Sequence, residues 1–546
     1  MNKYNEFLAE LFEQSATVLI AADLIKKLNE KFEVTDNYAR QIISRAVKNK
    51  IIKSSEPFSF EKRQYFYMNK NQHISTNTLL TISRLHRKPL YRLLKLLLKT
   101  GGICSYYEAE KITATPTSNK DKYRVISLDE EIRRLTKVHI IKEVKDKRGI
   151  PFLILLEEIN IEDHDMVKNK INAHHANMNR DVMFIIDIIR WLKNNGFISD
   201  QVWYRRKDNP NIGSIINDFP FDATTFTKTT GYSLDAGKVD DKNTIVVMDI
   251  LIYRSYSKID LDAFYDRIQS IRHSTKKESI RKIMPIIFYV DIEDNIKNEI
   301  NNLHILSFSL KSIMGSKIIH VIEEYNNIKR IIDESLTIDE EKSSDVIEKI
   351  SSTIEIIENT GQMENLQNLK GDLFEILMYM VLSCLFKQPY FEHSKIIKST
   401  DDQKTYEFDI IVEDKEEDEV VVIELKGLKN TTIINLGDTS TNNTVNWFFG
   451  KTYPIAKKYY AQRSQHDKSR IKACYITSAN FSNEAIQKLD EYNQSKKIKP
   501  TNFDCYYDRK KLLDLLKSHS NLKFIRKKTG FIHMLERYYL KESNDS

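Results

Sequence analysis

The sequence predicts a multidomain protein of mixed α+β and α/β class. The chain has 546 residues, which is too long for a single hydrophobic core. Its N-terminal part alternates short amphipathic helical patterns with hairpin-like runs, whereas the rest alternates apolar strand-like runs with amphipathic helices. No run approaches the roughly 20 apolar residues that cross a bilayer. We therefore expect several domains, a cytoplasmic location and no membrane partner.

Composition excludes some classes of function. The four cysteines lie far apart and form no CxxC pair, which argues against a disulfide framework and against a zinc site. No GxxxxGK[ST] motif occurs, so we expect no nucleotide hydrolysis by this chain. The net charge of +7 is modest for this length and does not by itself indicate a nucleic-acid partner. The distribution of the charges is more informative than their sum.

Residues 1–75 are expected to form a small domain of three helices followed by two short strands around Pro57. This order resembles a winged helix, in which the third helix enters the major groove of DNA. The pattern TDNYARQIISRAVKNK predicts that helix over 35–50, with isoleucines on its inner face. Its outer face carries the side chains expected to contact phosphates and base edges: Arg40, Gln41, Ser44, Arg45 and Lys48. The alternative is a winged helix that contacts only protein.

The same pattern recurs over residues 84–160. We expect helices over 84–99, 102–113 and 121–140, followed by a hairpin wing over 140–158. The tip of this hairpin carries three basic side chains expected to contact the phosphate backbone: Lys145, Lys147 and Arg148. Two winged helices in tandem would bind double-stranded DNA over a larger footprint than one.

The middle of the chain is expected to form an α/β domain and a connector. Residues 163–330 carry helical patterns and several strand-like apolar runs, among them FPFDATTF, NTIVVMDILIY and MPIIFYVD. Residues 331–365 are acidic and polar, with isoleucines at helical spacing. We therefore expect a helical connector before the last domain, which covers residues 366–546.

The segments YEFDIIVED and EVVVIELK of the last domain carry a candidate active site. An acidic turn between them predicts a hairpin, which would bring Asp409 close to the end of the second strand. Residues two apart in a strand point to the same face, so Glu424 and Lys426 project together while Leu425 enters the core. Two carboxylates beside an ammonium suit Mg²⁺ or Mn²⁺ and the hydrolysis of phosphodiesters.

These residues resemble the PD-(D/E)xK nuclease superfamily, which has the restriction-endonuclease-like fold, over about 366–539. Asp409 matches the first acid of the family motif, and Glu424 and Lys426 match its (D/E)xK. Glu375, in GDLFE on the preceding helix, matches an accessory acid of many members. The resemblance implies an αβββαβ domain in which Asp409, Glu424 and Glu375 hold Mg²⁺ or Mn²⁺ and Lys426 places the attacking water. The family's proline is absent, because Phe408 stands before Asp409.

The central domain repeats this succession of elements. Asp222 falls where Asp409 does and Asp249 where Glu424 does, but Leu251 replaces the lysine. We therefore expect a degenerate, catalytically inactive restriction-endonuclease-like domain, in which the two aspartates could still hold a metal. The alternative is an unrelated α/β domain.

A polar stretch and a helix follow the candidate site. The stretch LKNTTIINLGDTSTNNTVN is expected to form a loop that faces the substrate. The helix after it carries interleaved cations and aromatics, of which Lys451 and Lys457 are expected to lie near DNA.

Together these features predict a Mg²⁺-dependent DNA endonuclease of the restriction or anti-phage defence type. A double-strand break needs two active sites, so a homodimer is expected, and accessory defence proteins are possible partners. One alternative is a nuclease that acts on RNA or on branched or single-stranded DNA. A second alternative is a DNA-binding regulator with a non-catalytic nuclease-like fold.

Overall fold

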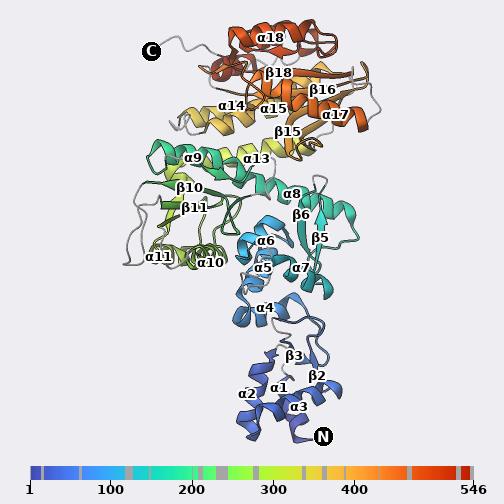
Figure 1. The fold of residues 1–546 in the computed structure, drawn as a ribbon, viewed down its shortest axis with the longest axis vertical. Coiled ribbons are helices and arrows are strands. Elements are labelled where there is room, and N and C mark those ends of the chain that lie inside the picture. Colours follow the sequence, from blue (N-terminus) through green and yellow to red (C-terminus); the bar gives the residue numbers. More distant parts are fainter. Residues whose placement is uncertain are drawn as a thin grey trace. The chain divides into compact units, whose positions relative to one another are not determined.

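The chain divides into two compact units (Figure 1). The N-terminal unit comprises Met1–Ile185 and Leu192–Ser309, and the C-terminal unit comprises Ile186–Trp191 and Leu310–Ser546. The structure is a computed structural model, and the residues it describes are 2–13, 18–60, 64–116, 127–146, 149–198, 201–206, 213–228, 244–274, 282–334, 340–359, 366–386, 389–428, 431–463, 470–523 and 531–540.

The first module of the N-terminal unit has the element order expected from the sequence. Its elements are α1 (Lys3–Leu11), β1 (Leu19–Ile20), α2 (Ala21–Phe32), α3 (Asp36–Lys48), β2 (Ile52–Ser54) and β3 (Phe66–Asn69). The strands form an antiparallel sheet in the order β1-β3-β2. Helix α3 buries Ala39, Ile42 and Ile43, whereas the five side chains predicted to contact DNA are exposed. The amphipathic pattern therefore gave the correct outer face of this helix.

Helix α4 (Thr76–His86) leads to a second module with the same order of elements. This module consists of α5 (Lys88–Lys99), β4 (Ile103–Ser105), α6 (Tyr106–Thr113), α7 (Leu128–Lys137), β5 (Ile141–Lys145) and β6 (Pro151–Leu155). Its strands are again antiparallel, in the order β4-β6-β5, which corresponds to β1-β3-β2.

Two of the expected helices of the second module begin later than predicted. The prediction of one helix over 102–113 was wrong, because residues 103–105 pair with β6 as a strand. Ser105 then caps α6 through a reciprocal capping box with Glu108. The helix expected from residue 84 begins only at Lys88, because α4 ends at His86 and a proline occupies the first turn of α5.

The rest of the N-terminal unit is built around a five-stranded central sheet. Its strand order is β13-β12-β11-β10-β7, with β7, β10 and β11 antiparallel in turn and β11, β12 and β13 parallel. Apolar side chains of α10 and α11 pack against β11 and β12. The elements are α8 (His164–Met183), α9 (Ile185–Asn194), β7 (Trp203–Tyr204), β8 (Ser214–Ile216), β9 (Phe219–Phe221), β10 (Ala223–Thr227), β11 (Thr244–Leu251), α10 (Lys258–Ser274), β12 (Ile283–Tyr289), α11 (Asp294–Asn302) and β13 (Leu306–Ser309).

Helices dominate the start of the C-terminal unit. They are α12 (Leu310–Met314), α13 (Ile318–Glu334) and α14 (Glu340–Asn359). Helix α14 lies within the segment 331–365, for which the sequence predicts a helical connector. None of the described helices of the chain is both long and apolar enough to cross a membrane.

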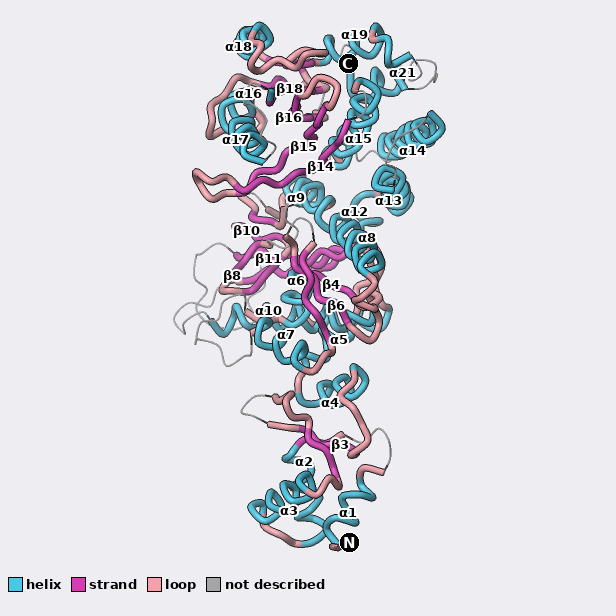
Figure 2. The backbone as a smooth tube through the Cα atoms, turned by 90° about the vertical axis from the view of Figure 1, so that its right-hand side faces the viewer, coloured by secondary structure: helices cyan, strands magenta, loops and turns pink. Residues whose placement is uncertain are grey.

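The C-terminal sheet is also five-stranded, and its order is β14-β15-β16-β18-β20 (Figure 2). The elements are α15 (Gln367–Leu385), β14 (Pro389–Lys398), β15 (Thr405–Asp414), β16 (Glu419–Lys426), β17 (Ile433–Ile434), α16 (Val445–Trp447), η2 (Phe448–Thr452), α17 (Tyr453–Arg463), β18 (Ile471–Thr477), β19 (Asn480–Phe481), α18 (Asn483–Gln494), β20 (Tyr506–Tyr507), α19 (Arg509–Ser518), η4 (Ser520–Leu522), α21 (Phe531–Leu535) and η5 (Glu536–Leu540). The order α15-β14-β15-β16-α17-β18 is the expected αβββαβ succession, and α17 and α18 pack on one face of the sheet.

The two five-stranded sheets share one topology. In the C-terminal sheet β14, β15 and β16 are antiparallel in turn, and β16, β18 and β20 are parallel. The strands of the two sheets correspond one to one, with the same order and the same directions: β7, β10, β11, β12 and β13 of the central sheet match β14, β15, β16, β18 and β20. A helix joins each parallel pair in both sheets. The repetition of element order that the sequence indicated is therefore a property of the fold.

Candidate active site

The hairpin of β15 and β16 brings together three of the four predicted catalytic residues. Ile410 pairs with Ile423, so the next pair along the ladder places Asp409 opposite Glu424. Leu425 is 1% exposed and belongs to the core, as its place in the alternation predicts. Asp409, Glu424 and Lys426 all retain some solvent access, with side chains 15%, 13% and 19% exposed.

Lys426 holds the two carboxylates together. Its Nζ lies 3.2 Å from Asp409 Oδ2 and 2.6 Å from Glu424 Oε1. Asp409 Oδ2 also accepts a hydrogen bond of 2.7 Å from the backbone N–H of Leu425. No hydrogen-bond donor or cation of the described residues contacts the second oxygens, Asp409 Oδ1 and Glu424 Oε2. Each carboxylate therefore presents one oxygen that is available to a cation.

The pKa values of Glu424 and Lys426 both lie well away from their ordinary values. The pKa of the Glu424 carboxyl is raised to about 7, because burial, together with repulsion by Asp409, outweighs the attraction of Lys426. Burial also disfavours the charged form of Lys426, but the two carboxylates outweigh it and hold the lysine pKa well above its ordinary value. Near neutral pH the lysine is therefore an ammonium, and Glu424 is poised between its two protonation states.

The donor set fits Mg²⁺ or Mn²⁺ as a two-carboxylate site. Among the described residues, no group of three or more His, Cys, Asp or Glu side chains is placed to hold a metal ion. Mg²⁺ usually keeps several waters and takes only one or two protein carboxylates, so Asp409 and Glu424 suffice. The resemblance implied that Glu375 would hold the metal together with these two residues. Within the described residues, the structure does not bring the three carboxylates together into one such group.

Glu375 nevertheless lies on the part of α15 that packs against the end of β16. A Cβ atom added at Gly427 would stand 2.5 Å from Cβ of Phe374, the residue before Glu375. This close approach requires glycine directly after Lys426. The half-buried Glu375 is thus supported on the helix turn beside the strand end.

One residue of this neighbourhood escaped the sequence reasoning. Tyr475 of β18 is paired with Glu424 across the parallel ladder, so the two side chains share one face of the sheet. The side chain of Tyr475 is fully buried, and its hydroxyl has no hydrogen-bond partner within the part of the chain that the structure describes. An aromatic residue within an apolar strand indicates only a core position, so the sequence carried no signal for a polar role.

The residues predicted to contact DNA have different surroundings. Lys145 is exposed at the end of β5, as expected of a wing, whereas Lys147 and Arg148 lie outside the described residues. Lys451 forms an ion pair of 3.1 Å with Asp402, and Lys457 donates to the hydroxyl of Tyr453 at 3.3 Å. The sequence did not reveal the pairing of Lys451, because Asp402 lies 49 positions away in the chain.

The polar stretch after β16 forms an ordered turn within its described residues. Asp438 Oδ1 accepts hydrogen bonds from the backbone N–H groups of Ser440 and Thr441, both at 2.8 Å. Gly437 adopts a positive φ of 60°, and a Cβ atom there would meet Thr444 at 2.5 Å. Residues 438–443 are exposed.

Comparison of the chain with models of known protein families, with curated proteins and with solved structures gave no match. The functional argument therefore rests on the geometry of the site and on the topology of the two sheets.

Proposed function

We propose that the chain is a Mg²⁺-dependent endonuclease that hydrolyses phosphodiester bonds of DNA at Asp409, Glu424 and Lys426. The observation that carries the proposal is the pair of adjacent carboxylates, each with one open oxygen, bridged by a lysine. This set lies where β15 and β16 come together in the C-terminal sheet. The elements α15, β14, β15, β16, α17 and β18 follow one another in the αβββαβ order of the PD-(D/E)xK superfamily. The C-terminal domain would then be the nuclease domain.

The bound Mg²⁺ would polarise the scissile phosphate and lower the pKa of a water. Asp409 and Glu424 would hold the cation. Lys426 stays protonated beside them, so it acts as a hydrogen-bond donor that orients the attacking water and stabilises charge on the phosphate, rather than as a base. The backbone N–H of Leu425 fixes Asp409 in place.

The two N-terminal modules would supply DNA binding as winged helices. Helix α3 presents basic and amide side chains on one exposed face, and β5 and β6 form a wing with Lys145 exposed. Phosphate contacts from these elements would position the duplex. A restriction or anti-phage role, a homodimer for double-strand cleavage and accessory defence partners extend the proposal by analogy with such nucleases.

Cleavage of plasmid DNA with Mg²⁺ or Mn²⁺ tests the proposal, with matched hairpin, single-stranded and RNA substrates beside it. Wild type should cut, and Asp409→Ala should bind DNA without cutting it. Lys415→Ala is the matched control, because Glu413 and Lys415 repeat the ExK spacing where β15 ends, and Lys415 is exposed in the turn of the same hairpin. Preferential cutting of RNA or hairpins would show that one of these, and not duplex DNA, is the substrate. Binding by wild type without cutting under every metal would instead favour a DNA-binding regulator.

A further inference from the structure

The acids of the central sheet occupy the same positions as those of the C-terminal site. Ala223 pairs with Met248, so the residue before β10, Asp222, stands opposite Asp249 as Asp409 stands opposite Glu424. Asp222 Oδ2 accepts a hydrogen bond of 2.7 Å from the backbone N–H of Ile250. Asp409 Oδ2 accepts one of the same length from Leu425, the residue after the facing acid. The correspondence therefore extends from topology to individual atoms.

The lysine of this second site comes from another part of the chain. Leu251, which takes the place of Lys426 in the sequence, is a buried side chain. Lys111 of α6 instead places its Nζ 2.5 Å from Asp222 Oδ2 and 2.8 Å from Asp249 Oδ1. The two carboxylates thus have a bridging ammonium, as their counterparts have in Lys426. The expectation that this site lacks a lysine was wrong, because the lysine belongs to the second module.

The surroundings of the central carboxylates differ from those of the C-terminal pair. Asp222 Oδ1 accepts from the hydroxyl of Tyr107 at 3.0 Å. Asp249 Oδ1 also meets Arg267 Nη2 at 3.1 Å, and its Oδ2 accepts from the hydroxyl of Tyr256 at 3.0 Å. Every oxygen of the two aspartates therefore has a protein donor, and both side chains are almost completely buried.

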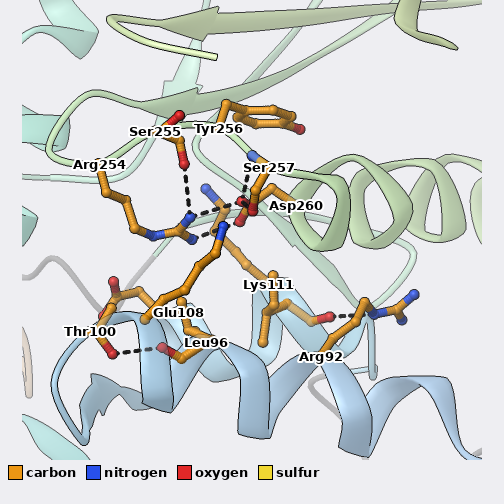
Figure 3. A network of polar contacts seen from close by, with 12 residues as sticks. Arg92, Leu96, Thr100, Glu108, Lys111, Arg254, Ser255, Tyr256, Ser257 and Asp260 are labelled. Carbon is orange, nitrogen blue, oxygen red and sulfur yellow. Dashed lines mark hydrogen bonds and ion pairs between the residues drawn. The ribbon is translucent and has the colours of Figure 1, made fainter. Parts of the chain in front are cut away.

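Helix α6 contributes further contacts to the same buried group. Glu108 pairs with His174 at 2.6 Å and accepts from the hydroxyl of Tyr253 at 2.5 Å. Figure 3 shows Glu108 and Lys111 on the helical side of this network, facing Arg254 and Asp260. The guanidinium of Arg254 in turn binds Asp260 through both of its terminal nitrogens.

We infer that the central domain is an inactive counterpart of the C-terminal nuclease domain, in which Lys111 and Arg267 occupy the carboxylates in place of a metal ion. Its former site is an ion-paired clamp that fastens α6, and with it the second module, to the central sheet. A metal ion would have to displace protein donors from Asp222 and Asp249 and would leave the cations of the site buried without partners. The description as an inactive nuclease counterpart rests on the proposed function, whereas the clamp stands on the contacts of the central domain alone.

Thermal unfolding and hydrogen exchange of the full chain test the clamp. Lys111→Met keeps the length of the side chain but removes the ammonium that the buried Asp222 and Asp249 share. Among the cations of the described residues, Asp222 then keeps only Arg205, at 3.4 Å, and Asp249 keeps only Arg267, so the melting temperature of the N-terminal unit should fall by roughly 10 °C. Amides of α6 should lose protection against exchange together with those at the ends of β10 and β11. Lys137→Met, at an exposed position of the neighbouring helix α7, is the control and should change neither readout.

A second variant separates the clamp from general damage to the fold. Asp222→Asn in the Lys111→Met background removes one of the carboxylate charges that Lys111 balanced, so it should recover part of the lost stability, although Asp222→Asn alone destabilises the protein. Additive losses in this cycle, or normal protection of α6 in Lys111→Met, would overturn the clamp.

Binding of Mn²⁺ alone tests whether the central carboxylates hold a metal. Asp222→Asn should bind as much Mn²⁺ as wild type, whereas loss of bound Mn²⁺ in this variant would overturn the inference. If Asp409→Ala retained all of the bound Mn²⁺, or if wild type bound none, the proposed nuclease site would fail. The unfolding and exchange measurements on Lys111→Met would still decide on the clamp.

Discussion

Lys426 Nζ lies 2.6 Å from Glu424 Oε1. The two residues are neighbours on one face of β16, and both face the carboxylate of Asp409. The lysine thereby compensates the carboxylates before any metal binds. A cation that binds the open oxygens meets carboxylates whose charge Lys426 already partly offsets, which weakens its attraction to them. The site is consequently held together by protein charges while Asp409 Oδ1 and Glu424 Oε2 stay open.

Lys426→Met should separate metal binding from cleavage. Removing the ammonium leaves two carboxylates close together, so Mn²⁺ should bind at least as tightly as it does to wild type. Cleavage should fall by about 100-fold or more, because the water and the phosphate lose their charged donor. Calorimetry with Mn²⁺ and single-turnover cleavage measure the two effects. A parallel loss of both would show that the lysine supports the metal site itself.

Metal binding should release a proton near neutral pH. The pKa of Glu424 is raised to about 7, and the metal binds the ionised form, so Mn²⁺ affinity should rise from pH 6 to pH 8. Without metal, the free energy of unfolding depends on pH in the opposite direction. The folded state holds this proton more tightly than the unfolded chain, so the contribution of Glu424 to stability is lost as pH rises from about 4.3 through 7.

Calorimetry in two buffers of different ionisation enthalpy measures the released proton. Glu424→Gln should abolish both the buffer dependence and the rise of affinity with pH. Binding heats that do not depend on the buffer at pH 7 would contradict the raised pKa.

Tyr475→Phe should reduce cleavage without reducing stability. The hydroxyl is buried and has no hydrogen-bond partner among the described residues, so its removal should leave the melting temperature unchanged or higher. We expect this hydroxyl to donate to the attacking water only when substrate is bound, so the cleavage rate should fall by about tenfold. A variant as active as wild type would show that the hydroxyl has no part in the reaction.

Gly427→Ala should damage the site through packing. The added Cβ would stand 2.5 Å from Phe374 Cβ, so α15 or the end of β16 must move, at a cost of about 1–3 kcal/mol. Stability by denaturant unfolding and cleavage should both fall. Gly371→Ala is the matched control, because its Cβ would stand 3.4 Å from the nearest atom and alanine favours the helix. Equal losses in the two variants would exclude this explanation.

Arg45→Ala should weaken binding of duplex DNA and lower the slope of log affinity against log salt by about 1. Arg45 lies on the exposed face of α3. Lys27→Ala, at an exposed position of α2, should leave the slope unchanged and serves as the control. Filter binding across a salt series gives both values. An unchanged slope in Arg45→Ala would favour the alternative that this module contacts only protein.

Local periodicity was enough to predict the C-terminal hairpin and the outer face of α3. In the hairpin, the alternation of EVVVIELK fixes the sides of Glu424, Leu425 and Lys426, and the acidic turn fixes the partner strand. These relations involve near neighbours in the chain. Ser105 shows where the same reasoning failed, since the strand that precedes this cap forms only by pairing with the distant β6.

The sequence by itself determined the amphipathic faces, the repeated order of elements and the acids of both sheets, because each depends on the spacing of residues within one segment. Only the tertiary structure decided which distant cation meets which acid. Lys111 reaches Asp222 across 111 positions of the chain, and Lys451 is paired with Asp402 across 49. Pairing at such distances depends on how separate elements pack, and the pattern of a single segment carries no record of it. The same packing left two oxygens open at Asp409 and Glu424 and closed those of Asp222 and Asp249.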